Sequence, residues 1–259
     1  MTEVNKTLFI PLYGKAKVSK QGVIMKDSYA EKIWEEEGFE FHGKSKWLTY
    51  NMAMRAKIFD EWTEEMLLLN SDSLVLHVGC GLDSRAFRIN KDYSNWIDAD
   101  FPEVVELRKK YFSENEKYKM IEFDATKLEM IEKLPDAKVV IVVFEGISMY
   151  LKNQELNAFI KVISEKYKLV RMLMDVYTDF GAKVSKYKNP INDVGVTTVW
   201  GIDNIETVLE GTNLKCKAEH TMTPEKMINE LPGYDKHFFK LLFTGKLYRK
   251  IYRLYEIGN

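Results

Sequence analysis

Residues 74–102 read LVLHVGCGLDSRAFRINKDYSNWIDADFP, and the rest of the chain is organised around this stretch. Its apolar start, residues 74–78, has the pattern of a strand that is buried on both faces of a parallel sheet. Gly79 and Gly81 follow at once, and residues 82–85 have the pattern of a helix start. Glycines between a buried strand and a helix allow a sharp turn and bring a ligand close to main-chain N–H groups. The stretch therefore predicts a ligand-binding loop at the end of a central strand.

A second strand is predicted over residues 95–100, and it ends in the carboxylates Asp98 and Asp100. These lie 19 and 21 residues after Gly79, where a carboxylate accepts hydrogen bonds from a ribose diol. Either acid could instead cap the helix that is predicted to begin at Pro102. The glycine turn and the acidic strand end together indicate a cofactor that contains a nucleoside.

Strand and helix patterns alternate through the middle of the chain. Strands are predicted over residues 74–78, 95–100, 118–123, 139–144 and 169–176. Two later strand patterns complete a predicted set of seven, at residues 214–219 and 251–257. We therefore expect an α/β fold with a Rossmann-like, doubly wound sheet of seven strands, mostly parallel with one terminal antiparallel strand.

The 259 residues are enough for one large domain with a substantial core. We expect residues 1–70 to form an N-terminal helical cap, residues 71–180 the cofactor-binding core, and residues 181–259 a lid and a C-terminal acceptor-side part. Residues 1–25 show little periodicity and are expected to lie across the surface as an arm. Glycine and proline within residues 180–198 favour a mobile loop or lid.

Two helices are predicted before the first strand, over residues 26–34 and 48–69, with Asp27 at or near the N-cap of the first. Arg55 interrupts the mostly apolar second helix. It is either a surface arginine or a guanidinium that clamps a carboxylate with two hydrogen bonds. His77, inside a strand, is interpreted as a buried histidine with satisfied hydrogen bonds.

Composition narrows the classes of function. A formal net charge of -1 gives no reason to expect nucleic acid or a membrane as the main partner. The two cysteines are too few for a disulfide framework or a cysteine metal site, and no metal site is predicted. The longest strongly apolar stretch, residues 139–144, is too short to cross a bilayer, and the first residues lack the apolar core of a signal peptide. We expect a soluble, cytoplasmic protein whose oligomeric state the sequence leaves open.

Two cofactors compete for the glycine loop. A nicotinamide dinucleotide fingerprint needs a glycine or alanine three residues after the second glycine, and Ser84 stands there. Carboxylates end three successive predicted strands, at Asp100, Asp124 and Glu145, and such strand ends line one crevice. A row of acids suits a ribose diol, an amine and a sulfonium better than a pyrophosphate, which favours S-adenosylmethionine. An NAD-dependent oxidoreductase and a non-catalytic nucleoside-binding module stay open as alternatives.

Three segments resemble the motifs of a known family. Residues 78–88 (VGCGLDSRAFR) are similar to the LGAGLDTRxxRL signature of the leucine carboxyl methyltransferase and polyketide O-methyltransferase family, which uses S-adenosylmethionine. Residues 98–102 (DADFP) are similar to its xDFP segment, and residues 145–151 (EGISMYL) to its EGxxxYL segment. Arg55 lies where the family has an arginine ahead of the first strand. The resemblance covers about residues 25–180 and implies the class I methyltransferase fold.

The resemblance also implies roles for the residues at the glycine loop. Arg55 would bind the methionine carboxylate of the cofactor. Gly79 and Gly81 would let the methionine moiety lie against the loop, and Asp100 would bind the ribose hydroxyls.

Further roles follow for residues after the third and fourth strands. Asp124 with Ala125 would contact the adenine, although Asp124 could also be an ordinary turn residue. Glu145 would lie near the methionine amino group.

Methyl transfer from a sulfonium is an in-line displacement that depends mainly on positioning and on the exclusion of water. A carboxylate acceptor is already anionic at neutral pH and needs no base, whereas a hydroxyl acceptor benefits from one. The sequence marks no histidine or acid as that base, and Tyr150 is the best candidate for an acceptor-side residue. We expect methyl transfer to an oxygen, carboxylate or hydroxyl, of a small-molecule acceptor. The alternative acceptor is the C-terminal carboxylate of a protein.

Overall fold

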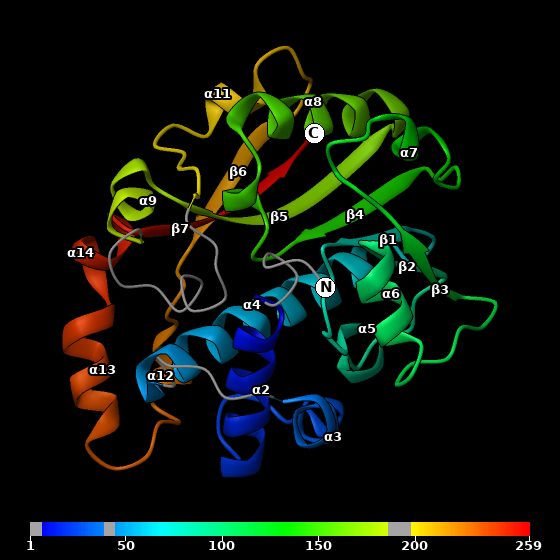
Figure 1. The fold of residues 1–259 in the computed structure, drawn as a ribbon. Helices are drawn as coiled ribbons and strands as arrows, with labels where there is room; N and C mark the ends of the chain where they lie inside the picture. Colours follow the sequence, from blue (N-terminus) through cyan, green and yellow to red (C-terminus); the bar gives the residue numbers. More distant parts are fainter. Residues whose placement is uncertain (1–6, 39–44, 186–197) are drawn as a thin grey trace.

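The computed structural model describes residues 7–38, 45–185 and 198–259. Within them a seven-stranded sheet runs through the molecule in the order β3-β2-β1-β4-β5-β7-β6, with helices on both faces (Figure 1). The strands are β1 (Leu74–Val78), β2 (Asn95–Asp100), β3 (Tyr118–Glu122), β4 (Val139–Phe144), β5 (Leu169–Tyr177), β6 (Lys215–His220) and β7 (Tyr252–Gly258). The prediction of seven strands is confirmed, with boundaries that differ by at most one residue.

β1 is at the centre of the sheet and pairs in parallel with both β2 and β4. The chain moves outward from β1 to β3 on one side and from β4 to β5 on the other. The strand order therefore reverses between β1 and β4, which is where open α/β sheets bind ligands. β7 runs antiparallel between β5 and β6, so the predicted terminal antiparallel strand is also confirmed.

The described helices surround this sheet. In chain order they are α2 (Phe9–Gln21), α3 (Ser28–Glu37), α4 (Lys46–Leu69), α5 (Arg85–Arg88), α6 (Pro102–Arg108), α7 (Glu129–Glu132), the 3₁₀ helix η1 (Ser148–Tyr150), α8 (Asn153–Lys166), α9 (Asp179–Ser185), α11 (Glu206–Leu209), α12 (Glu225–Ile228), α13 (Asp235–Phe243) and α14 (Gly245–Arg249). Asp27 caps α3 as predicted, because its carboxylate accepts the N–H of Ala30 at 2.9 Å.

Two hydrophobic cores fill the two faces of the sheet. On one face, Phe59 of α4 shares a core with Val75 of β1. On the other, Leu156 of α8 and Val208 of α11 share a core with Leu76 of β1. Val75 and Leu76 are consecutive, and consecutive side chains of a strand point to opposite faces. Figure 1 shows the result, with α8 and α11 above the sheet and α4 below it.

The expectation of a surface arm over residues 1–25 is wrong for the part that the structure describes. Phe9–Gln21 forms the helix α2, which packs against α3 and α4 and buries Leu12. The same helix buries the polar residues Lys15 and Ser19. Because polar and apolar residues are buried together, the sequence shows no apolar stripe of the kind that reveals a surface helix.

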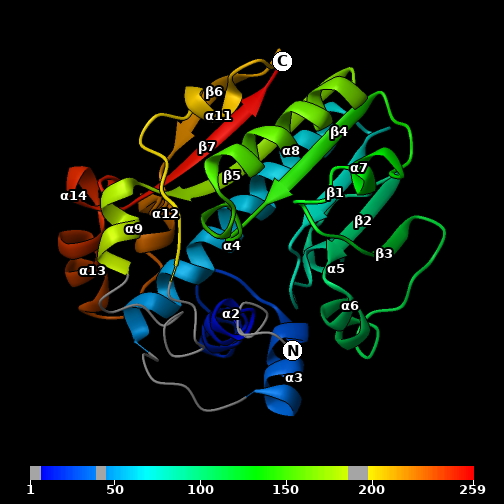
Figure 2. The ribbon, with the colours of Figure 1, turned by 45° about the horizontal axis from the view of Figure 1, so that its top comes forward.

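α2 and α4 cross at close range. A Cβ on Gly14 of α2 would lie 2.9 Å from the Cβ of Met52 on α4, so glycine permits this approach. Figures 1 and 2 both show α2 and α3 on the side of α4 that faces away from α8. The N-terminal helices thus form a layer beyond α4.

The predicted lid segment, residues 180–198, is described only in part. Its start belongs to α9, a helix that follows β5 after Thr178. Residues 186–197 lie outside the described residues. The expectation of a mobile lid therefore stays a prediction. In the part of the chain that the structure describes, no helix is long and apolar enough to cross a membrane.

Candidate active site

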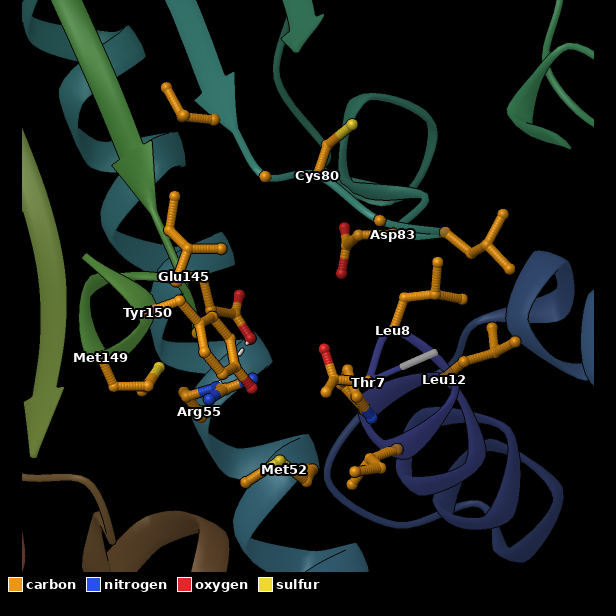
Figure 3. Close-up of a pocket in the computed structure, with 18 of the residues that line it drawn as sticks. Thr7, Leu8, Leu12, Met52, Arg55, Cys80, Asp83, Glu145, Met149 and Tyr150 are labelled. Carbon is orange, nitrogen blue, oxygen red and sulfur yellow. Dashed lines mark hydrogen bonds and ion pairs between the residues drawn. The ribbon is translucent and has the colours of Figure 1, made fainter. Parts of the chain in front are cut away.

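A cavity of about 1050 Å³ lies at the carboxyl ends of the central strands, between the sheet and the N-terminal helices (Figure 3). One part, the strand-end half, holds the glycine loop and the acids of the strand ends, and it is lined by Gly79, Gly81, Asp100, Asp124, Ala125 and Glu145. The other part, the aromatic half, is lined by Trp47, Leu48, Asn51, Met52, Tyr150, Tyr177, Phe243, Tyr248 and Ile251. Arg55 lines the same cavity, so the fold brings every predicted site residue to one place.

The glycine loop follows β1 with Gly79 at φ 63° and Gly81 at φ 52°. The N–H of Gly79 donates to the carbonyl of Ala99 on β2 at 2.8 Å, which ties the loop to the neighbouring strand. A Cβ on residue 79 would lie 2.4 Å from Cγ2 of Ile147. Both the backbone conformation and the available space therefore require glycine at position 79.

Asp100 ends β2 beside this loop and is buried. Its Oδ2 accepts the N–H of Gly81 and its Oδ1 the N–H of Phe101, both at 2.7 Å. Burial raises the pKa of the Asp100 carboxyl, and these two hydrogen bonds oppose that rise. A carboxylate has about four acceptor sites, so Asp100 retains capacity for two hydroxyl groups of a ligand.

Asp98 is enclosed by protein and does not line the cavity. Its Oδ2 accepts hydrogen bonds from Arg108 and from the hydroxyl of Tyr118, and its Oδ1 accepts the indole N–H of Trp96. Burial alone would raise the pKa of Asp98, but the Arg108 guanidinium together with the contacts to His77 and the Tyr118 hydroxyl outweighs it and brings the pKa to about 2. The two acids that the sequence could not separate therefore differ: Asp98 holds α6 through Arg108, and Asp100 lines the cavity.

Asp124 and Ala125 line the cavity just after β3. Oδ1 of Asp124 accepts the N–H of Thr126 at 3.0 Å and its hydroxyl at 2.7 Å, which closes an Asx-type turn. Within the described residues both hydrogen bonds go to this one oxygen. The interpretation of Asp124 as a turn residue and its placement toward a ligand are thus compatible.

Glu145 directly follows β4 and lies between two arginines. Its Oε1 accepts a hydrogen bond from Nε of Arg55 at 2.9 Å, and its Oε2 accepts one from Nη2 of Arg85 at 2.5 Å. Burial alone would raise the pKa of Glu145, but the two guanidiniums outweigh it and bring the pKa to about 2. Glu145 is therefore a fixed negative charge in the strand-end half at neutral pH.

Arg55 is only 6% exposed, which excludes the surface alternative. Besides Glu145, it contacts Asp175 on β5 and Tyr252 on β7: Nη1 donates to Oδ2 of Asp175 at 3.0 Å and to the Tyr252 hydroxyl at 2.8 Å. Nη2 faces Gly146, where a Cβ would lie 3.0 Å from it. With Nε and Nη1 engaged, a clamp that uses two nitrogens would require one of these bonds to be exchanged for a bond to the ligand.

Lys15 is a site residue that the sequence analysis missed. It is 3% exposed, lines the cavity, and forms an ion pair with Asp83 of the glycine loop. Asp83 also accepts a hydrogen bond from Arg88 at 2.7 Å. A lysine in a segment without periodicity gives no signal of such a position. Lys15 and Arg55 are two buried cations that line the cavity.

His77 is 2% exposed, with Nδ1 3.2 Å from Oδ1 of Asp98 and Nε2 3.3 Å from Nη1 of Arg85. The interpretation as a buried histidine with satisfied partners is confirmed. Among the described residues, no group of three or more histidines, cysteines or acids is arranged to hold a metal ion.

Tyr150 belongs to η1 and forms a side-chain hydrogen bond with Thr7. Figure 3 shows its ring beside Arg55 and Glu145. Burial raises the pKa of Tyr150, and it does the same for Tyr248. Both hydroxyls therefore keep their protons at neutral pH, so they supply hydrogen bonds and do not act as bases.

Comparison with known proteins gives the family. A family model described as leucine carboxyl methyltransferase matches residues 12–164, more than half of the chain. The tetracenomycin polyketide synthesis O-methyltransferase TcmP of Streptomyces glaucescens is 30% identical over 209 residues, which cover 79% of this chain and 77% of that protein. This chain belongs to the leucine carboxyl methyltransferase family. The resemblance inferred from three short motifs is confirmed.

A further relative and two solved structures are also similar to this chain, the structures in fold alone. The S-adenosyl-L-methionine-dependent methyltransferase dpfgK of Gibberella zeae is 24% identical over 239 residues, with 82% of this chain and 80% of that protein covered. A candidate methyltransferase from Thermobifida fusca YX has a similar fold, with a TM-score of 0.59, 13% identity, and 95% of this chain and 93% of that chain covered. Magnesium protoporphyrin IX methyltransferase from Synechocystis PCC 6803, solved with bound S-adenosylhomocysteine, has a TM-score of 0.53 at 12% identity, with 90% and 94% covered.

As a member of the leucine carboxyl methyltransferase family, the chain is an S-adenosylmethionine-dependent methyltransferase. The dehydrogenase, which the partial glycine pattern left open, and the non-catalytic module both give way to this assignment. The cavity fits the cofactor on its own chemistry. The strand-end half offers a glycine cradle at Gly79 and a carboxylate with spare acceptor sites at Asp100. It also offers buried cations and a buried anion, in Lys15, Arg55 and Glu145, for the charged end of an amino acid.

Proposed function

We propose that this methyltransferase transfers the methyl group to an oxygen, of a carboxylate or a hydroxyl, on a small and largely apolar molecule. The composition of the aromatic half carries the proposal. Its walls are aromatic and aliphatic, with tyrosine hydroxyls and one amide. The acids and the histidine among the described lining residues of the whole cavity come from the parallel strands, the segments that follow them and α6: His77, Asp83, Asp100, Glu103, Asp124 and Glu145. An acceptor that ionises by itself needs no base, and a carboxylate or an acidic phenol meets that condition.

The strand-end half is the proposed cofactor site. We propose that Asp100 binds the ribose hydroxyls, that Asp124 and Ala125 contact the adenine, and that Gly79 and Gly81 adjoin the methionine part. The positions of these residues at or after the ends of β1, β2 and β3 support this order, because the three strands are neighbours in the sheet and the residues line the same cavity.

The charged end of the methionine moiety would lie near β4. We propose that its carboxylate meets Arg55 and Lys15 and that its ammonium approaches Glu145. Arg55 would use Nη2 first, because Nε and Nη1 already donate to protein groups. With its two ends held in this way, the cofactor would have its sulfonium between them, next to the aromatic half.

When bound, S-adenosylmethionine supplies a methyl group on a positively charged sulfur. The protein's part is to hold the acceptor in line and to exclude water, which accounts for most of the rate enhancement expected of such a displacement. Tyr150, which keeps its proton, would orient the acceptor oxygen by hydrogen bonding, together with Thr7. We therefore propose Tyr150 as the acceptor-side residue and assign it no role as a base.

The proposed division of the chain follows from the same cavity. Residues 71–180 would form the cofactor core, while residues 1–70 and 181–259 would supply the cap and most of the acceptor side. Trp47, Asn51, Phe243 and Tyr248 support this division, because they reach the aromatic half from α4 and from the C-terminal helices.

Transfer of a labelled methyl group tests the proposal. The protein is incubated with methyl-labelled S-adenosylmethionine and, in separate reactions, 2-naphthoic acid, 2-naphthol and a peptide that ends in leucine. Label in a naphthalene product is the expected result, and release of volatile methanol by base distinguishes a methyl ester from an aryl ether. Label in the peptide alone would favour the protein-carboxylate alternative. The Asp100→Ala variant is the matched negative control, because it lacks the proposed ribose partner.

A further inference from the structure

The aromatic half contains one polar pair that no step of methyl transfer requires. Tyr248 of α14 donates its hydroxyl proton to Oδ1 of Asn51 on α4 at 2.8 Å. Both residues line the cavity, and Asn51 is 7% exposed. Asn51 is buried and Tyr248 is half-buried, and polar groups within an apolar wall are costly unless their hydrogen bonds are satisfied, so each of these side chains depends on the other.

The orientation of the Asn51 amide is fixed by its other contact. Nδ2 donates to the main-chain carbonyl of Trp47 at 2.9 Å. A carbonyl oxygen can only accept, so the amide nitrogen must face Trp47 and the amide oxygen must face Tyr248. The hydroxyl proton of Tyr248 is therefore committed to Asn51. What Tyr248 retains toward a ligand is its oxygen lone pairs.

The walls around the pair suit a flat ring. Trp47 and Phe243 lie with ring centroids 6.0 Å apart at 32°, and Phe243 meets Tyr248 edge to face at 6.3 Å. Such aromatic walls favour aromatic ligands through offset or edge contacts. An oxygen that can only accept, set in such a wall, selects for a ligand that brings an O–H or N–H.

We propose that Asn51 and Tyr248 form a recognition site for a hydrogen-bond-donating substituent, a ring hydroxyl or N–H, on a flat aromatic acceptor. This inference rests on the proposed function, since it places the acceptor in the aromatic half. The Tyr248 hydroxyl oxygen would accept the hydrogen bond from that substituent. Asn51 is a positioning residue that sets the direction of the Tyr248 proton.

Binding of paired probes to the whole protein, saturated with S-adenosylhomocysteine, tests the site. The probes are 2-naphthoic acid, its monohydroxy derivatives and the methoxy counterpart of each derivative. Their binding is measured by titration calorimetry. At least one hydroxy isomer should bind about three- to tenfold more tightly than both the parent acid and its methoxy counterpart, the gain typical of one hydrogen bond.

Two variants and a control make the test specific. Tyr248→Phe should abolish the preference for that hydroxy isomer over the parent acid. Asn51→Leu frees the Tyr248 proton, so the preference for hydroxy over methoxy should shrink or reverse. Tyr50→Phe is the matched control. Tyr50 precedes Asn51 on α4 and lies outside the cavity lining, and the substitution removes a hydroxyl that donates to Oδ2 of Asp235 at 2.8 Å. Binding of S-adenosylhomocysteine to each variant verifies that it is folded.

Three results would overturn the inference. One is a wild-type protein that does not distinguish hydroxy, methoxy and unsubstituted probes. A second is the same preference in Tyr248→Phe and Asn51→Leu as in the wild type. The third is binding of S-adenosylhomocysteine with no binding of any probe, which would reject the aromatic acceptor site and leave the cofactor assignment intact. Failure to bind S-adenosylhomocysteine would instead contradict the proposed function itself.

Discussion

Asp98 and Asp100 stand two residues apart on the same face of β2, yet Asp100 lines the cavity and Asp98 does not. The difference lies in what covers each carboxylate. Arg108 and the hydroxyl of Tyr118 bind Asp98, whereas main-chain N–H groups bind Asp100. The same residue type thus anchors a helix at one position and is available to a ligand at the other.

The two acids should therefore respond differently to substitution. Asp100→Ala is expected to weaken S-adenosylmethionine binding by about one to two orders of magnitude, because the ribose hydroxyls lose a charged acceptor. Asp98→Asn should leave that affinity nearly unchanged but lower the free energy of unfolding by about 3 kcal/mol, since Arg108 loses its buried counter-ion. Titration calorimetry and urea unfolding on both variants check this. Wild-type affinity in Asp100→Ala would remove Asp100 from the cofactor site.

Arg55→Lys should affect both stability and binding. Lysine cannot reach Glu145, Asp175 and Tyr252 at once, so the buried acids lose part of their compensation and the free energy of unfolding should fall by about 3 kcal/mol. Cofactor affinity should fall as well, because a point charge does not reproduce the planar fork. Lys57→Arg, elsewhere on α4, is the control for the exchange of cations. An unchanged dissociation constant in Arg55→Lys would contradict a role for Arg55 at the methionine carboxylate.

Gly79→Ala tests the cradle. Alanine at φ 63° is strained by about 1 to 2 kcal/mol, and its Cβ would also overlap Ile147. We expect S-adenosylmethionine binding to drop at least tenfold, read by calorimetry. Gly211→Ala is the matched control, because Gly211 has φ 73° and a Cβ there would meet no described atom within 4 Å. If the two substitutions had equal effects on binding, backbone strain alone would explain the result. A role for Gly79 in contacting the cofactor would then be rejected.

Stability should decline on the acid side. The pKa of Glu145 is lowered from its ordinary 4.5 to about 2, so its favourable contribution is complete above pH 4.5 and is lost as the pH falls toward 2. The shift corresponds to about 3 kcal/mol. Burial raises the pKa values of Asp100 and Asp175, so their protonation favours the folded state. Their contributions to stability therefore increase as the pH falls, opposite to that of Glu145. Urea unfolding from pH 6 to pH 3 measures the net effect.

The Glu145→Gln variant isolates the contribution of this carboxylate. The difference in free energy of unfolding between wild type and variant should be largest above pH 5 and should shrink toward pH 2.5. A difference that stays constant over this range would show that Glu145 does not titrate as its two arginines imply.

Local sequence patterns were enough to predict much of this fold and part of the candidate site. The run at residues 74–78 and the glycines after it have a strong local signature, and they did form a central strand and a positive-φ loop. Strand-end acids could be expected at one edge of the sheet because parallel strands align their carboxyl ends. Asp100 and Glu145 are there for that reason.

What the sequence left open depends on contacts between distant segments. The roles of Asp98 and Asp100 are separated by Arg108, which a pattern of residue types does not place. The burial of Arg55 depends on Tyr252, 197 positions away. Lys15 belongs to α2, whose mixed buried face gives no periodic signal. Each of these is a long-range pairing, and periodicity reports only short-range order.

The insertion of β7 between β5 and β6 makes the codons for residues 252–258 unusually consequential. A premature stop codon just ahead of Tyr252 would take away the hydroxyl that binds both Asp175 and Arg55. It would also leave β6 without a neighbour in the described sheet, because β6 pairs with β7 and with no other strand there. A nonsense mutation at that position would therefore be expected to behave as a complete loss of function.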